Sequence, residues 1–222
     1  MIMKKLILLC LSLFVAGFVS AQESGKIQYE LTLNIHATLK PDQLQYKDLI
    51  PETSTVRSVL FFNGGNAKIM LLPENTESEE GGVKMKIQMD NSIKFIETAS
   101  QSIFKLDESG SQKKLIVTKF DENGEKQSTS KIGTKTKTIA GYTCKEVKVK
   151  SDDGPITLWV TDKLPFKGGI IGMYSPYGAI LGMESKKMSI LATSIQFEPV
   201  DPGTVKIPEG VPIEESNGKL SL

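Results

Sequence analysis

The residue types that most often do chemistry in proteins are few in this chain and lie far apart. His36 is the only histidine, and no cysteine or carboxylate cluster stands near it at the spacing of a metal site. A histidine that acts as a base also needs a nucleophile and an orienting acid, and the sequence indicates neither. We therefore interpret His36 as a partly exposed polar residue.

Two acidic pairs and one glycine-rich stretch are the other candidates for chemistry. Glu79-Glu80 and Asp152-Asp153 lie beside glycines in expected loops, where neither burial nor a charged neighbour separates the pKa values of paired carboxyl groups. The three glycines within residues 168–172 fit neither of the usual nucleotide-binding fingerprints. We predict no catalytic residue, no metal ligand and no cofactor, and hence that the chain is not an enzyme.

The N-terminus has the pattern of a secretory signal. Lys4 and Lys5 precede an apolar run over residues 6–19, and Ser20-Ala21 supplies small residues before Gln22. The apolar run is shorter than the roughly 20 residues of a membrane-spanning helix. We predict a cleaved signal peptide over residues 1–21, no stable membrane insertion, and a mature protein that is exported, either periplasmic or secreted.

Charge and cysteine content exclude some classes of function. Lysine and arginine total 27 against 26 aspartates and glutamates, so the clustered basic excess of a nucleic-acid-binding protein is not expected. Once the signal is removed, Cys144 is the only cysteine, and an internal disulfide is then impossible. We interpret Cys144 as a small buried hydrophobe in a strand.

Alternation of apolar and polar residues dominates the remaining chain and predicts strands with one buried face. It is clearest over residues 27–35, where every second residue is apolar. Turn sequences such as residues 63–66, Asn-Gly-Gly-Asn, separate the runs. The expected strands lie at residues 27–35, 56–62, 67–72, 83–89, 92–97, 102–106, 115–120, 147–149, 156–161 and 188–197.

Helical signals are sparse, with one short candidate at residues 41–50 and a turn or two expected at residues 174–182. The pattern predicts a mainly β fold, a curved antiparallel open half-barrel of about ten strands with one or two short helices. Residues 22–198 would form this single domain, and the proline-containing residues 199–222 an extended C-terminal tail. The apolar face of such a sheet must be covered. It can be covered by folding the sheet on itself, or by a ligand in an open concave side.

One region resembles a known family. Gly141-Tyr142-Thr143-Cys144 is followed by Trp159, Leu164-Pro165, and a run over residues 176–184 that begins Pro-Tyr-Gly-Ala-Ile-Leu. This order resembles the GLPGLI family, or a sister uncharacterised-domain family, of exported proteins in Bacteroidetes. These families are similar to the periplasmic lipoprotein-carrier clan. The resemblance implies the open half-barrel fold with small covering helices, and it implies no known catalytic residues.

From the curved sheet, the methionines and the resemblance, we expect a non-catalytic module that holds a lipid or other apolar ligand in the concave face. Methionine suits irregular apolar ligands, although it also fills ordinary cores. The expected ligand-binding residues are Phe62, Met70, Met85, Met89, Trp159, Met173, Ile180 and Leu181. The alternative is a cell-envelope structural or protein-interaction domain with a filled core, whose partner is an envelope protein. An enzyme ranks last.

Overall fold

The computed structural model describes residues 23–72, 77–80, 83–86, 91–120, 130–151 and 154–216. The predicted signal peptide, residues 1–21, lies outside these ranges, as do Met89 and the Asp152-Asp153 pair. Met85 lies in a described strand, but its side chain is outside the described set.

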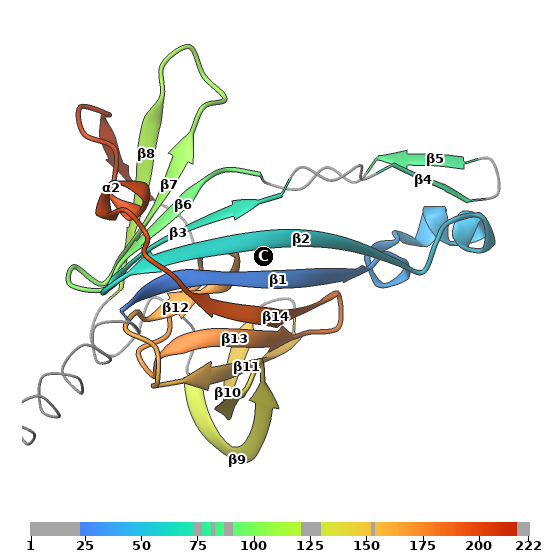
Figure 1. The fold of residues 1–222 in the computed structure, drawn as a ribbon. Coiled ribbons are helices and arrows are strands. Elements are labelled where there is room, and N and C mark those ends of the chain that lie inside the picture. The colour runs from blue at the N-terminus through green and yellow to red at the C-terminus, as the bar shows by residue number, and fades with distance from the viewer. Residues whose placement is uncertain are drawn as a thin grey trace, which may run out of the picture.

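Most of the chain forms one open, curved β-sheet of 13 strands (Figure 1). A separate two-stranded hairpin joins β4 (Glu77–Glu80) and β5 (Val83–Lys86). The strands of the main sheet are β1 (Ser24–Asn34), β2 (Thr53–Asn63), β3 (Asn66–Leu71), β6 (Lys94–Glu97), β7 (Ser102–Asp107), β8 (Lys114–Lys119), β9 (Ser130–Ile139), β10 (Tyr142–Ser151), β11 (Gly154–Thr161), β12 (Gly168–Gly169), β13 (Ala179–Glu184), β14 (Met188–Phe197) and β15 (Ile213–Glu215).

The order along the sheet is β15-β8-β7-β6-β3-β2-β1-β14-β13-β11-β10-β9, and β12 pairs with β13. Within the described residues the two end strands, β15 and β9, do not pair with each other, so the sheet stays open. All neighbours are antiparallel except the pairs β15–β8 and β12–β13. The predicted mainly β, open and curved architecture is confirmed, with more strands than expected.

The helices are short: η2 (His36–Thr38), η3 (Pro41–Leu49), η4 (Ile170–Gly172) and α2 (Pro202–Val205). Helix η3 confirms the prediction at residues 41–50. In the range 174–182, where a turn or two is expected, the structure has a turn at residues 176–177, and β13 occupies the second half of the range. Among the described residues, no helix is both long and apolar enough to cross a membrane.

The two faces of the sheet follow from the alternation in β1. Ile27, Tyr29 and Leu31 are buried on one face, here called the inner face. Residues directly opposite each other in antiparallel strands share a face. Leu60 of β2 is opposite Ile27, and Phe62 is opposite Gly25, so both also lie on the inner face.

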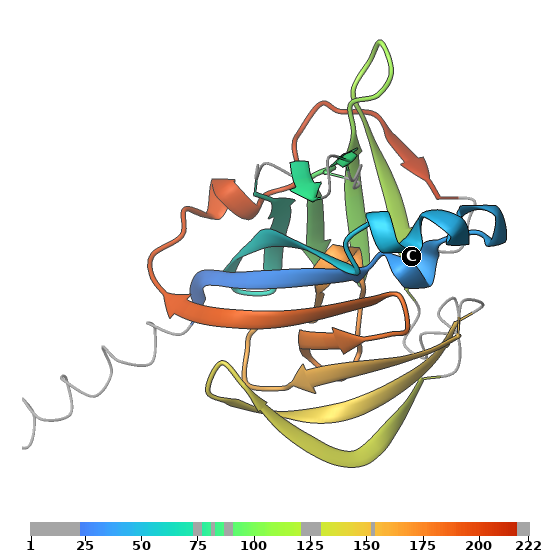
Figure 2. The ribbon, with the colours of Figure 1, turned by 90° about the vertical axis from the view of Figure 1, so that its right-hand side faces the viewer.

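The chain itself covers the inner face. Residues 164–178, here called the inner segment, lie between the two arms of the curved sheet (Figure 2). The Phe166 ring packs on the Phe62 ring with centroids 5.4 Å apart, and the Tyr174 ring stacks on the Phe120 ring at 5.1 Å. Phe166 and Tyr174 are only 1% and 2% exposed. The concave side is therefore filled by side chains of the same molecule.

Glycines allow the inner segment to fold tightly on itself and to approach the sheet. Gly168 has a φ of +85°, and a Cβ there would stand 2.4 Å from the Met173 carbonyl oxygen. Gly178 has a φ of +135°, and its Cβ would stand 2.2 Å from the Thr161 oxygen. Both the backbone conformation and the close approach require glycine.

The outer face of β6, β7 and β8 has a second, smaller cluster. Phe95, Phe104, Leu115 and Val117 are buried there and pack against Ile207 and Val211 of the C-terminal stretch. Residues 199–216, where the sequence predicts an extended tail, thus run over the sheet and include α2 and β15. Helix α2 contacts β2 and β3, and β15 adds to the edge of β8.

Replacing Phe166 with alanine tests whether the inner segment is part of the core. We expect Phe166→Ala to lower the free energy of unfolding by about 3–5 kcal/mol, because it removes a buried aromatic ring and leaves a cavity. Leu44→Ala in η3 is the control, since Leu44 is 53% exposed and should change stability by no more than about 0.5 kcal/mol. Urea unfolding measures both, and equal effects would contradict the packing described here.

Candidate functional site

The predicted pocket residues are divided between the two faces. Phe62 lies on the inner face, and Met173 belongs to the inner segment that packs there. Met70 is opposite Val59, so it lies on the outer face. Trp159 is opposite Gly182, which is opposite Leu191 in turn, and this row is also on the outer face.

Burial limits what four of the predicted pocket residues can bind. Phe62, Ile180 and Leu181 are 0% exposed, and Met173 is 5% exposed. These four residues belong to a single buried cluster with the inner segment. A ligand could reach them only if residues 164–178 moved away from the sheet.

The polar groups inside this cluster are held neutral. The Tyr29 hydroxyl donates a hydrogen bond to the Ile180 carbonyl oxygen at 3.0 Å, and complete burial raises the pKa of Tyr29 far above its usual value. Burial also raises the pKa of the Cys144 thiol from 9.0 to about 11. Cys144 is 0% exposed, as expected for a structural thiol.

His36 has a structural contact. Its Nε2 atom is 2.8 Å from the Ile50 carbonyl oxygen. This contact links the two ends of the segment that contains η2 and η3. Among the described residues, no group of three or more histidine, cysteine or acidic side chains is arranged to hold a metal ion.

A charged cluster surrounds Trp159 on the outer face. The Trp159 Nε1–H donates to Glu184 Oε1 at 3.1 Å, and Lys137 Nζ donates to the same oxygen at 2.9 Å. Lys137 Nζ also lies 5.5 Å from the centroid of the Trp159 ring, within cation–π range. The Lys137 hydrogen bond is the main cause that lowers the pKa of Glu184.

Sequence reasoning missed Lys137 and Glu184 as partners of Trp159. Lys137 lies in β9, an edge strand without apolar alternation, and Glu184 ends β13, a strand that the sequence did not predict. No signal in the sequence places either residue against the tryptophan. Lys137 and Glu184 contact the indole ring, and only 7% of Trp159 is exposed.

Comparison with known families identifies the family of this chain. The family described as "N-glycanase peptide, N-terminal domain" (PNGase_F-II_N) matches residues 75–206, more than half of the 222 residues. The chain belongs to this family. A comparison with curated proteins finds no match.

Solved structures agree on the fold. The structure of PNGF-II in space group C2 matches with a TM-score of 0.55 and 15% identity, over 87% of this chain and 31% of that chain. The structure of PNGF-II in space group P21 gives 0.53 and 13%, over 87% and 32%. The chain thus spans about a third of the length of these proteins, and at such identity the likeness shows the fold alone.

The resemblance to the GLPGLI family is wrong, because the family that matches is the N-glycanase N-terminal domain. The residues that suggested it have general structural roles. Ala140 and Gly141, with φ of 46° and 86°, form the tight turn between β9 and β10, and Tyr142 and Cys144 begin β10. Residues 179–184 form β13, a strand that the sequence did not predict. Such a hairpin occurs in many antiparallel sheets, so it does not distinguish one family from another.

The acid dependence of the Lys137–Glu184 pair can be measured. A carboxyl whose pKa is lowered on folding stabilises the protein above its unfolded pKa, and the stabilisation is lost as the pH falls through the folded pKa. A double-mutant cycle with Lys137→Met and Glu184→Gln should give a coupling free energy below about 1 kcal/mol at pH 7, since both side chains are partly exposed.

This coupling should decline once the pH falls below 4.5, the ordinary pKa of the carboxyl group, and approach zero when Glu184 is protonated. Urea unfolding at pH 7 and at stepwise lower pH gives the comparison. A coupling that stays constant down to full protonation of Glu184 would contradict the charge-based account of the cluster.

Proposed function

We propose that this chain is an exported, non-catalytic accessory module of the N-glycanase type, which acts through protein contacts on its surface. The observation that carries the proposal is the filled inner face, in which Phe166 and Tyr174 occupy the place where a ligand would lie. Membership of the N-glycanase N-terminal domain family supports an accessory role beside a catalytic unit that removes N-glycans. Export is supported by the pattern of residues 1–21.

The state of the polar groups supports a role without catalysis. Tyr29 and Cys144 are buried with raised pKa values, so both stay protonated at neutral pH. Glu184, the carboxyl group in the Trp159 cluster, is already paired with Lys137. A general acid or base works best with a pKa near the operating pH, and these shifts move each group away from it.

Lipid binding in the inner face remains a second candidate. Its support is the apolar lining formed by Phe62, Ile180 and Leu181, and the glycine conformations at Gly168 and Gly178 that border the inner segment. It requires residues 164–178 to leave the sheet. That movement would expose Phe166, Ile170 and Tyr174 to water, which is unfavourable at about 25 cal/mol for each Å² of apolar surface.

The first test separates accessory from catalytic roles. The purified mature chain, incubated with a denatured N-glycosylated protein, should release no glycan, because its polar groups are used in structural contacts. Mass spectrometry of the glycoprotein measures the release. The same glycoprotein digested by an active N-glycanase is the positive control. Glycan release by this chain alone would overturn the non-catalytic proposal.

The second test decides between the filled core and the lipid-binding candidate. We expect no saturable binding of a fluorescent fatty acid by delipidated protein, and no lipid adduct in native mass spectra of the protein as purified. Binding in a 1:1 ratio with a micromolar Kd would contradict the filled-core account. Phe166→Ala serves as the matched variant, because it opens space beside Phe62 and should be the first form to bind the probe.

A further inference from the structure

Strand β9 is one of the two end strands of the sheet, and no strand among the described residues pairs with its outer edge. This strand is ten residues long, and only Ile139 in it is buried. Within the described residues β9 pairs with β10 alone, so its other edge presents backbone N–H and C=O groups that no strand satisfies. Such an edge is a template for an additional strand.

Lysines concentrate at this end of the sheet. Strands β9 and β10 together have six lysines and one acidic residue, Glu146. Lys131 stands directly opposite Lys148 on the same face, and like charges in that arrangement repel. Glu146 is 5% exposed and its carboxylate lies over Gly133, 4.0 Å from Lys148 Nζ, so it offers little to a partner.

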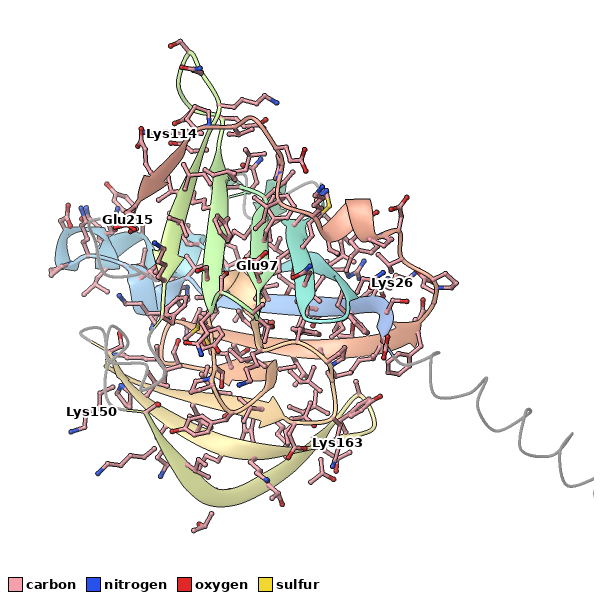
Figure 3. All side chains as sticks on the ribbon, turned by 90° about the vertical axis from the view of Figure 1, so that its left-hand side faces the viewer. Lys26, Glu97, Lys114, Lys150, Lys163 and Glu215 are labelled. Carbon is pink, nitrogen blue, oxygen red and sulfur yellow. The ribbon has the colours of Figure 1, made fainter. Side chains whose placement is uncertain are left out.

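At the opposite end of the same sheet, an acidic strand pairs with a strand that contains lysines. There β15, with the sequence Ile-Glu-Glu, adds in parallel to β8. Lys114 Nζ contacts Glu214 Oε2 at 2.9 Å, and Lys119 Nζ contacts Glu215 Oε1 at 2.8 Å. Figure 3 labels Lys114 and Glu215 at this closed end and Lys150 of β10 toward the other end. The fold thus already closes one lysine-bearing strand with an acidic extended segment.

We propose that β9 is a docking edge for an extended acidic segment of a partner protein, which adds to the sheet as a further strand. The backbone of the segment would satisfy β9, and its carboxylates would neutralise Lys131 and Lys135. Ile132 is 56% exposed and lies on the opposite face from Lys131. A segment that alternates apolar and acidic residues therefore matches both faces.

The charges also select against other occupants. The β9 edge of a second copy would bring lysine against lysine, so self-association through this edge is disfavoured. A nucleic acid would use the lysines but leave the backbone edge unsatisfied. The inference rests on the proposed function, since it names the kind of partner that the module contacts.

The test uses a capped peptide of three Ile-Glu repeats and the intact mature protein. We expect saturable binding by isothermal titration or fluorescence anisotropy, and slowed amide exchange in residues 131–138. The double variant Lys131→Glu/Lys135→Glu should weaken binding at least tenfold. The control Lys113→Glu/Lys206→Glu, with the same change in charge at exposed lysines away from β9, should stay within twofold of the original protein.

Two further ligands separate strand addition from simple charge attraction. The same peptide with alternate backbone nitrogens methylated keeps its charge but loses backbone donors, and it should bind at least tenfold more weakly. Equal binding of the methylated peptide, equal loss in both lysine variants, or saturable binding of single-stranded RNA in place of the peptide would overturn the proposal. Absence of peptide binding overturns this inference alone, whereas glycan release would overturn the proposed function.

Discussion

Coverage of the inner face by the chain's own residues 164–178 is the constraint on which the rest of the structure depends. A curved sheet with an apolar concave side is stable only when that side is removed from water. Here the Phe166–Phe62 and Tyr174–Phe120 ring contacts remove it. Gly168 lets the inner segment fold tightly on itself, and Gly178 lets its backbone approach β11 closely. The concave side thereby becomes part of the core rather than a ready binding site.

The outer face is covered only in part. Its β6–β8 part is covered by Ile207 and Val211, and its Trp159 region by Lys137 and Glu184. With the inner face occupied, the regions left for contacts are the loops, the edges and the uncovered part of the outer face, where Leu191 is 41% exposed. The β15 end already has its extra strand, whereas the β9 end does not. The two ends of the sheet differ because the C-terminal stretch of the chain supplies β15 next to β8, whereas no described segment pairs with the outer edge of β9.

The sequence predicts the strands that have one solvent-exposed and one buried face, because apolar and polar residues alternate along them. Residues 27–35 are the clearest case. Strand β9 was not predicted, because both of its faces are exposed and apolar residues do not recur at every second position among its lysines and threonines. Strand β13 was not predicted for the opposite reason, because five of its six residues are buried and the run shows no alternation of apolar and polar residues. The sequence does not reveal which face of its strand Trp159 occupies, and the pairing of β11 with β13 places it on the outer face. The family resemblance was wrong because it rested on a few short motifs, from Gly141 to residues 176–184, one of which is a hairpin turn common to many sheets.

Hydrogen exchange of backbone amides tests the filled inner face most directly. The Gly169 amide donates to the Met173 oxygen at 2.9 Å and the Met173 amide to the Ile170 oxygen at 3.0 Å, both beneath the sheet. The account predicts that these two amides exchange as slowly as those at the centre of β1, through global unfolding. Exchange as fast as that of the exposed Ser109 amide would mean that the inner segment leaves the sheet readily, and it would contradict the account.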